Sequence, residues 1–260
     1  MLEHLESRRL LAAQLVGTVL TITGTAGDDV IEFARRGGGF KVFERIGNSV
    51  SESSWDYSAI SRVIVNAGNG NDRVIVGRLA VHVELNGGAG NDTLSAGGGN
   101  DTIRGGDGND DMFGGDGRDL LIGGAGADTM LGGGSRDVVD YSDRTANLVI
   151  TLGITADDGE AGENDLVATD IEVVVGGSGD DHISTASGRS VSLYGAAGND
   201  TLIGGSGPDL LEGGPGRDFM SGQAGNDVFQ AQDGEIDTID GGSGSDTGVF
   251  DDGDLFTSVP

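Results

Sequence analysis

Three consecutive nine-residue segments, GGDGNDDMF (105–113), GGDGRDLLI (114–122) and GGAGADTML (123–131), are the most informative part of this sequence. Each begins with Gly-Gly, has Asp at its sixth place and has an apolar residue two places later. A short period of this strictness predicts a solenoid built from one structural unit per repeat. The pattern G-G-x-G-x-D-x-U-x, in which U is apolar, therefore sets the frame for the whole chain.

The same frame extends on both sides of this stretch. In a first run the sixth place is held by Asp92, Asp101, Asp110, Asp119, Asp128 and Asp137. A second run has Asp200, Asp209, Asp218 and Asp227 and, after one inserted residue, Asp237 and Asp246. Looser copies place Asp29, Asp72 and Asp181 in the same position.

Each place in the repeat has a physical interpretation. The glycines allow positive φ and close backbone approach, and the frequent Asn at the fifth place predicts a left-handed residue there. Places seven to nine predict a short strand whose middle side chain points inward. Eighteen residues then complete one coil with two strands back to back, so that Asp92 stacks on Asp110 and Asp110 on Asp128.

The composition excludes several classes of partner and core. Acidic residues outnumber basic ones 43 to 15, giving a formal charge of −28, which disfavours nucleic acid and anionic membranes and favours cations. The chain has no Cys, so disulfides and thiolate metal sites are impossible. Only 36% of residues are hydrophobic and 51 are Gly, so an apolar core alone is thin for this length.

The stacked carboxylates need a cation. Parallel strands lie ~4.8 Å apart, and like charges at that range repel by roughly 3–4 kcal/mol at an effective dielectric constant of about 20. A divalent cation between two loops would attract both carboxylates and so turn this repulsion into a net attraction. Carboxylate and carbonyl oxygens, without Cys or clustered His, indicate Ca²⁺ rather than zinc or copper, and Mg²⁺ fits less well because it keeps its waters.

The spacing of 18 residues predicts six calcium ions, and looser pairs raise the expected limit to ten. Six regular pairs are 92/110, 101/119, 110/128, 119/137, 200/218 and 209/227. Four looser pairs are 72/92, 181/200, 218/237 and 227/246.

These motifs resemble the RTX, or haemolysin-type, calcium-binding nonapeptide repeats. The resemblance is strict over residues 87–140 and 195–230 and implies a parallel β-roll with calcium between successive loops. It implies the sixth-place aspartates as ligands, namely Asp72, Asp92, Asp101, Asp110, Asp119, Asp128, Asp137, Asp181, Asp200, Asp209, Asp218, Asp227, Asp237 and Asp246. It adds the carbonyl groups of loop glycines Gly106, Gly108, Gly115, Gly117, Gly124, Gly126, Gly205, Gly207, Gly214 and Gly216. Departures from the pattern occur at Ala96, Ser135, Ala196, Gln223 and Gly248.

The expected fold class is all-β: a parallel β-roll (β-solenoid) with two roll modules and a β-rich N-terminal cap. A bare apolar segment precedes each run (RVIV, 62–65, and EVVV, 172–175), and we interpret both as caps. The expected divisions are a leader (1–16), the cap with degenerate repeats (17–86), the first roll (87–140), an acidic connector and cap strand (141–175), the second roll (176–250) and a tail (251–260).

Two features have alternative interpretations. The connector loop DDGEAGENDL (157–166) is either a solvated acidic loop or an additional calcium site, although it lacks the EF-hand order. The glycine runs could form a disordered linker, which we expect of the calcium-free chain only. A phosphate-binding loop is disfavoured because no GK[ST] motif follows the glycines.

The N-terminus bears on localisation. The apolar stretch from Leu10 follows Glu3 and Glu6 and lacks a cleavage motif, so it does not fit a secretory signal peptide, and no segment is long enough to span a membrane. The segment LESRRLL resembles the start of many exported bacterial repeat proteins. The RTX resemblance implies an extracellular or cell-surface protein exported by a type I, non-Sec route.

We expect no enzymatic activity, because the chain has neither HExxH nor G-x-S-x-G, and its three His are scattered. The expected function is a secreted module that folds on binding calcium and acts as scaffold or adhesin. The alternative is an accessory domain that stabilises a secreted enzyme or binds polysaccharide for it. Possible partners are extracellular polysaccharide, a cell surface, or a second copy bound through an outer sheet face at Leu120, Ile122 and Val138.

Overall fold

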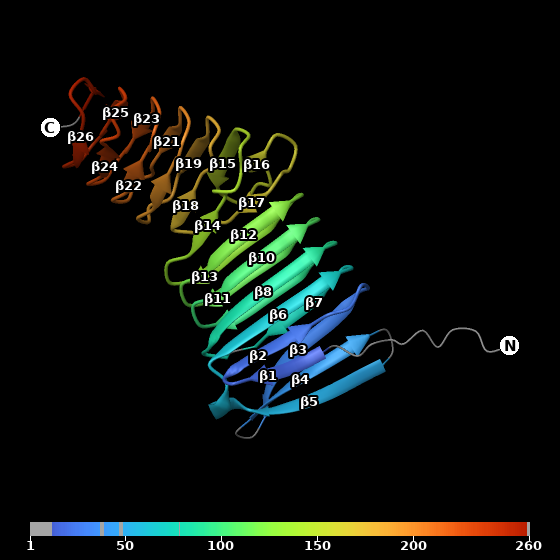
Figure 1. The fold of residues 1–260 in the computed structure, drawn as a ribbon. Helices are drawn as coiled ribbons and strands as arrows, with labels where there is room; N and C mark the ends of the chain where they lie inside the picture. Colours follow the sequence, from blue (N-terminus) through green and yellow to red (C-terminus); the bar gives the residue numbers. More distant parts are fainter. Residues whose placement is uncertain (1–11, 37–38, 47–48, 78, 259–260) are drawn as a thin grey trace.

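The computed structural model describes residues 12–36, 39–46, 49–77 and 79–258, so most of the expected leader (1–16) lies outside the described residues. The described chain winds into a β-solenoid of stacked parallel coils (Figure 1). It contains one 3₁₀ turn, η1 (Tyr57–Ala59), and no α-helix within the described ranges. The expected all-β roll is confirmed.

Three sheets form the walls of the solenoid. A 12-stranded sheet runs along one side in the order β1 (Ala12–Val16), β2 (Val19–Thr23), β6 (Arg62–Asn69), β8 (His82–Ala89), β10 (Thr102–Asp107), β12 (Leu120–Ala125), β14 (Val138–Asp140), β18 (Val173–Val175), β20 (Ser192–Tyr194), β22 (Leu210–Glu212), β24 (Val228–Ala231) and β26 (Thr247–Phe250).

The opposite side is divided between the other two sheets. The 8-stranded sheet has the order β17 (Leu166–Val167), β13 (Thr129–Gly134), β11 (Asp111–Asp116), β9 (Thr93–Gly98), β7 (Arg73–Val76), β3 (Asp29–Arg36), β4 (Gly39–Ile46) and β5 (Ser49–Asp56). The 7-stranded sheet has the order β16 (Gly159–Glu160), β15 (Leu148–Leu152), β19 (His182–Thr185), β21 (Thr201–Ile203), β23 (Phe219–Ser221), β25 (Thr238–Asp240) and β27 (Leu255–Phe256).

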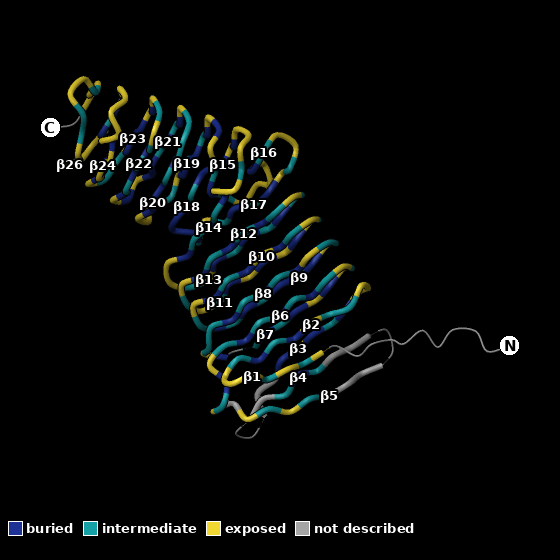
Figure 2. The backbone as a smooth tube through the Cα atoms, viewed as in Figure 1, coloured by how far each residue is buried: buried dark blue, intermediate teal, exposed yellow. Residues whose placement is uncertain are grey.

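The register follows the predicted 18-residue coil. Ile103 pairs with Leu121 in the 12-stranded sheet, and Met112 pairs with Met130 in the 8-stranded sheet. All four are fully buried, as the inward-pointing eighth place requires. Figure 2 shows buried segments recurring along the strands of every coil, between exposed turns. The core is therefore a narrow column of side chains between the sheets, with one large apolar residue from each of β10 to β13 and two or more from strands such as β2 and β6.

The first coil is more regular than its sequence suggests. Strands β2 and β3 pair in parallel with β6 and β7, as later coils do. The antiparallel strands β1, β4 and β5 are added at this end of the solenoid, where they extend the two sheets beyond the first coil. The cap thus consists of these added strands, while Arg62–Asn69 is an ordinary strand of the sheet.

The two rolls share one wall. Strand β18, expected as the cap of a separate second roll, pairs in parallel with β14 on one side and β20 on the other. The interruption lies only on the opposite side, where the 8-stranded sheet ends at β17 and the 7-stranded sheet begins at β16 and β15. Figure 1 shows the solenoid changing direction at this junction.

Strand length differs between the halves. In the first half β10 to β13 have six residues each and include the glycines that follow the apolar place, whereas β20 to β23 have three. The prediction of three-residue strands is thus correct for β20 to β23, one residue too short for β19, β24 and β26, and too short for the first half.

Candidate metal centre

The sixth-place aspartates lie in two columns, one along each edge of the solenoid where the chain turns between sheets. One column holds Asp72, Asp92, Asp110 and Asp128 and then Asp181, Asp200, Asp218 and Asp237. The other holds Asp101, Asp119 and Asp137 and then Asp209, Asp227 and Asp246. All of these predicted ligands are buried, with at most 5% of their surface exposed.

A hydrogen-bond ladder joins the aspartates within each column. The backbone N–H of Asp92 donates to Oδ1 of Asp110 at 2.8 Å, and the N–H of Asp110 donates to Oδ1 of Asp128 at 2.9 Å. The same bond, between 2.7 and 3.0 Å long, links every one of the ten pairs predicted from the spacing. The structure therefore brings together all the predicted carboxylate neighbours.

The second carboxylate oxygen, Oδ2, has no hydrogen-bond donor in twelve of these aspartates. Oδ2 is buried and accepts no hydrogen bond from any described residue in Asp72, Asp92, Asp101, Asp110, Asp119, Asp128, Asp137, Asp200, Asp218, Asp227, Asp237 and Asp246. A buried, unpaired acceptor is destabilising, and for an ionised group the cost is larger still. Repeated twelve times in two columns, this arrangement needs a positive charge that the protein does not supply.

Burial accordingly disfavours the charged form. The pKa of Asp110 is raised to about 6 and that of Asp128 to about 7, mainly by desolvation and in smaller part by neighbouring carboxylates. In the second half desolvation raises the pKa of Asp218 to about 7, with Asp200 and Asp237 adding to the effect. A divalent cation beside Oδ2 would remove this penalty.

Loop glycines shape the space beside Oδ2. A Cβ added to Gly105 would collide with Oδ2 of Asp110 and with the carbonyl oxygen of Gly123 in the next coil. The same two kinds of oxygen, the loop's own Oδ2 and a first-place carbonyl, crowd Gly87 and Gly114. First-place glycines were absent from the predicted ligand set, although their recurrence in most copies of the repeat was a usable signal.

The predicted glycines at the second and fourth places have a separate role. Gly106, Gly108, Gly115, Gly117, Gly124, Gly126, Gly214 and Gly216 all have positive φ, between 93° and 154°. An added Cβ on Gly106 would collide with the carbonyl oxygen of Gly88 in the coil before. Gly205 and Gly207 do not adopt positive φ.

The fifth-place Asn residues were predicted to be left-handed, and this was wrong. None of them has positive φ. Their side chains instead form a second ladder: Oδ1 of Asn91 accepts the backbone N–H of Asn109, and Oδ1 of Asn109 accepts that of Ala127. The amide therefore contributes a bond between coils.

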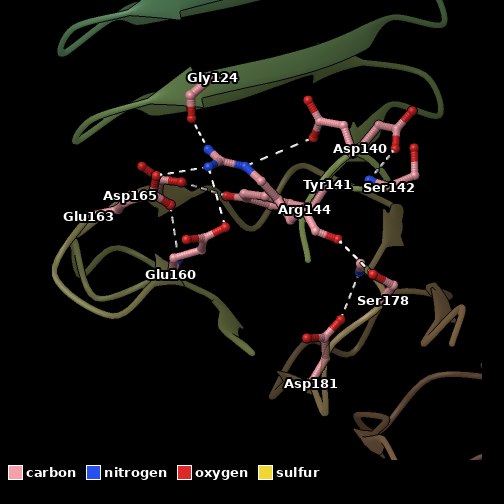
Figure 3. A network of polar contacts seen from close by, with 12 residues as sticks. Gly124, Asp140, Tyr141, Ser142, Arg144, Glu160, Glu163, Asp165, Ser178 and Asp181 are labelled. Atoms are coloured by element: carbon pink, nitrogen blue, oxygen red, sulfur yellow. Dashed lines mark hydrogen bonds and ion pairs between the residues drawn. The ribbon is translucent and has the colours of Figure 1, made fainter. Parts of the chain in front are cut away.

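The connector supplies its own partners for its acids (Figure 3). Asp165 occupies the next position of the first column, where Oδ1 accepts the N–H of Asp128 at 2.9 Å and Oδ2 accepts the hydroxyl of Tyr141 at 2.8 Å. Arg144 pairs with Glu163 at 3.0 Å and Glu160 at 3.5 Å and donates to the carbonyl of Gly124.

Two further connector acids complete this picture. The oxygens of Asp158 accept the N–H groups of Thr151 and Val167, at 2.5 and 2.8 Å. In the second column Glu172 takes the ladder position and accepts the N–H of Asp137 at 3.0 Å. Asp158 and Asp165 are buried, and each of their four carboxylate oxygens accepts a hydrogen bond from a protein donor, whereas Asp157 and Asn164 of the same loop are exposed.

Sequence reasoning missed three ladder members. Asp165, Glu172 and Asp254 each accept a backbone N–H from the sixth place of the coil before. All three follow irregular loops. Asp29, which the repeat pattern did identify, begins the first column, and its N–H donates to Oδ1 of Asp72.

The donor set indicates the metal. Within the described ranges, no group of three or more His, Cys, Asp or Glu side chains converges as a metal site. Each position between coils therefore offers carboxylate and backbone carbonyl oxygens only. This set fits Ca²⁺, which takes six to eight oxygen ligands including carbonyls, and does not fit zinc, which prefers nitrogen and sulfur.

Comparison with known proteins agrees with this chemistry. The family model of the RTX calcium-binding nonapeptide repeat (4 copies) matches residues 21–32, 86–121, 113–142, 168–189 and 194–229. A search of curated proteins found no match. The matched segments contain loops from both columns and both halves of the solenoid. The chain therefore carries RTX calcium-binding nonapeptide repeats in both halves of the solenoid.

Proposed function

We propose that this protein is a calcium-dependent folding module that acts outside the cell as a scaffold or adhesin. The observation that carries the proposal is the double column of buried Oδ2 atoms without a protein donor. The aspartates and first-place glycine carbonyls would hold the ions, and the bound ions would supply the charge that stabilises the stacked loops. Binding energy then becomes folding energy.

Calcium titration tests this proposal. We expect the chain to be expanded without calcium and to become compact and β-structured as calcium rises into the range of about 10⁻⁴–10⁻³ M typical of extracellular modules. Circular dichroism and small-angle scattering report the two properties independently. A compact β-structured chain after exhaustive calcium removal would contradict the proposal.

An extracellular location and type I export are part of the same proposal. Calcium dependence supports them, because such a chain would remain unfolded in a low-calcium cytosol and fold after export. Within the described residues no helix is long and apolar enough to cross a membrane. Appearance of the chain in the medium only when a type I exporter is present would test the route.

We also propose that the chain has no catalytic activity of its own. The carboxylate pairs that could resemble an acid–base pair are engaged in the ladder, and the His82 ring contacts the backbone carbonyl of Asn100. Co-purification with a catalytic chain, or retention on an extracellular polysaccharide, would instead favour the alternative role as an accessory domain.

Self-association through the outer sheet face is a further proposal. Leu120 pairs with Val138, and Val138 with Val173, so these side chains adjoin in a depression bordered by Arg118 and Arg136. Replacing Leu120 and Ile122 together by Thr should lower any oligomeric state of the calcium-loaded protein. Unchanged sedimentation and stability would mean that the face is ordinary strand packing.

A further inference from the structure

The loops that carry the sixth-place aspartates have two backbone forms. In the open form, the residue four places before Asp has positive φ, for example 118° at Gly106, 107° at Gly124 and 67° at Gln223, and Oδ2 of the Asp has no donor. Eleven of the twelve aspartates with an unpaired Oδ2 have this form. The twelfth, Asp237, follows the loop with the inserted residue, where Gly234 has a φ of 97°.

In the capped form, the same residue turns its N–H onto Oδ2. Gly177 donates to Asp181 and Gly205 to Asp209, each at 2.7 Å, and neither glycine has positive φ. Thr25 donates to Oδ2 of Asp29 in the same way at 2.6 Å. The peptide has therefore rotated so that a donor stands beside Oδ2.

Both oxygens of the capped aspartates are occupied. Oδ1 of Asp181 accepts the N–H of Leu148 at 2.8 Å, and Oδ1 of Asp209 accepts that of Val191 at 2.9 Å. The positive end of each N–H dipole lies where a cation would have to approach the carboxylate. The capped loop thus satisfies its charge with backbone donors and repels a metal ion.

The repeat motif does not distinguish the two forms. GGSGDD (176–181) and GGSGPD (204–209) are capped, whereas GGSGSD (241–246) is open, with a φ of 82° at Gly242. The capped loops stack on coils that have Leu148 and Val191 instead of Asp at the sixth place. A neighbouring coil without the sixth-place Asp is not sufficient to produce the capped form, however, because Asp101 stacks on Val83 and its loop remains open.

We propose that Asp181 and Asp209, like Asp29, are structural residues of calcium-free joints, and that calcium binds only between consecutive open aspartates. This inference rests on the proposed calcium function. It removes 181/200 and 209/227 from the ten predicted pairs and leaves 72/92, 92/110, 110/128, 101/119, 119/137, 200/218, 218/237 and 227/246.

Locating the ions in crystals of the full calcium-loaded chain by anomalous scattering tests the inference. We expect no ion within coordinating distance of Asp181 or Asp209, and ions at open pairs. An ion on either residue, with its loop rotated to positive φ, would overturn the inference while supporting the calcium function. Absence of ions from the whole chain would instead overturn the calcium function on which the inference rests.

Matched variants provide a second measurement. Asp218→Asn affects two open pairs and should lower the calcium stoichiometry, determined by native mass spectrometry, by up to two. Asp209→Asn should leave the stoichiometry unchanged, although it lowers thermal stability because Gly205 N–H loses an acceptor. A loss of one ion from Asp209→Asn would contradict the assignment.

If Asp209→Asn does not fold, amide exchange in the wild-type protein replaces it. The Gly177 and Gly205 amides should be protected from exchange in the calcium-loaded state because both remain bonded to carboxylates. Rapid exchange of both amides in the loaded chain would mean that the caps have opened and that the inference is wrong.

Discussion

The regular coils and the junction between the two halves both stack buried carboxylates, but they differ in how the charge of these carboxylates is compensated. In the regular coils Asp110 has one oxygen in the ladder and one without a donor. At the junction Asp165 occupies an equivalent position, yet Asp128 and Tyr141 occupy both of its oxygens, and Arg144 neutralises the nearby Glu160 and Glu163. The comparison shows that a stacked carboxylate is stable with an internal donor and cation, or else with an external ion.

Removing the internal cation should have the largest effect. The Arg144 side chain is 15% exposed and bridges the partly buried acids Glu160 and Glu163, so Arg144→Met leaves their charges uncompensated and should cost up to about 3–5 kcal/mol of unfolding free energy. Arg104→Met is the control, because its side chain is 46% exposed and 3.9 Å from Glu84, and should cost at most about 1 kcal/mol. Denaturation at saturating calcium measures both, and equal losses would contradict the role of Arg144.

Closing the space beside Oδ2 should have the next largest effect. Gly123→Ala places a methyl group against Oδ2 of Asp128 and should cost about 1–3 kcal/mol and weaken calcium binding. Gly27→Ala is the matched control, since no atom lies within 4 Å of the added Cβ. Calorimetric titration of both variants separates loss of a site from general destabilisation.

Removing the donor to Asp165 at the junction should leave its Oδ2 unpaired, as Oδ2 is in the regular coils. Tyr141→Phe removes the donor to Oδ2 of Asp165, which should cost about 1–3 kcal/mol in stability. If an unpaired Oδ2 is what attracts calcium, part of this loss should be recovered as calcium is raised. A loss independent of calcium would show that the open loop conformation is also required.

Acidification should affect the calcium-free and calcium-loaded states in opposite directions. Desolvation raises the pKa of Asp92 and Asp110 to about 6 and that of Asp128 to about 7, so the folded calcium-free chain binds more protons than the unfolded one between about pH 4 and 7. Its stability should therefore rise as pH falls through this window, whereas the loaded chain should lose calcium. Circular dichroism of dialysed samples measures the first effect; β structure that decreases on acidification would contradict it.

The regular part of this comparison could be predicted from the sequence, because the period alone fixes which residues stack. Six of the ten aspartate pairs and the buried eighth-place column follow from counting by nine and eighteen, and the other four pairs follow from the looser copies, whose aspartates are 19 or 20 residues apart. The departures from the nonapeptide pattern were also visible in the sequence. Three of the substituted residues, Ser135, Ala196 and Gln223, adopt the left-handed conformation of the glycines they replace, with φ of 90°, 80° and 67°.

The junction could not be predicted in the same way. Asp165, Glu172 and Arg144 reach the ladder through irregular loops, whose path depends on contacts between residues far apart in the sequence. The capped loops could not be predicted either, since the peptide before Gly205 can rotate without any change in the glycine pattern of the sequence. The misassigned fifth-place Asn shows a related error, because its preference for αL is weaker than the bond between coils that its side chain makes.

The ladder of aspartates also has a direction. Each carboxylate accepts from the coil before it in the chain, so the loop amide of Asp92 has its acceptor only once the coil containing Asp110 has formed. The asparagine ladder runs the opposite way, because Oδ1 of Asn91 accepts the N–H of Asn109. In terms of polymer growth, a coil added at either end therefore completes hydrogen bonds of the coil already present, and assembly should propagate in both directions from a formed pair of coils. The antiparallel strands β1, β4 and β5 lie at the N-terminal end of the stack, where they would stop growth in that direction.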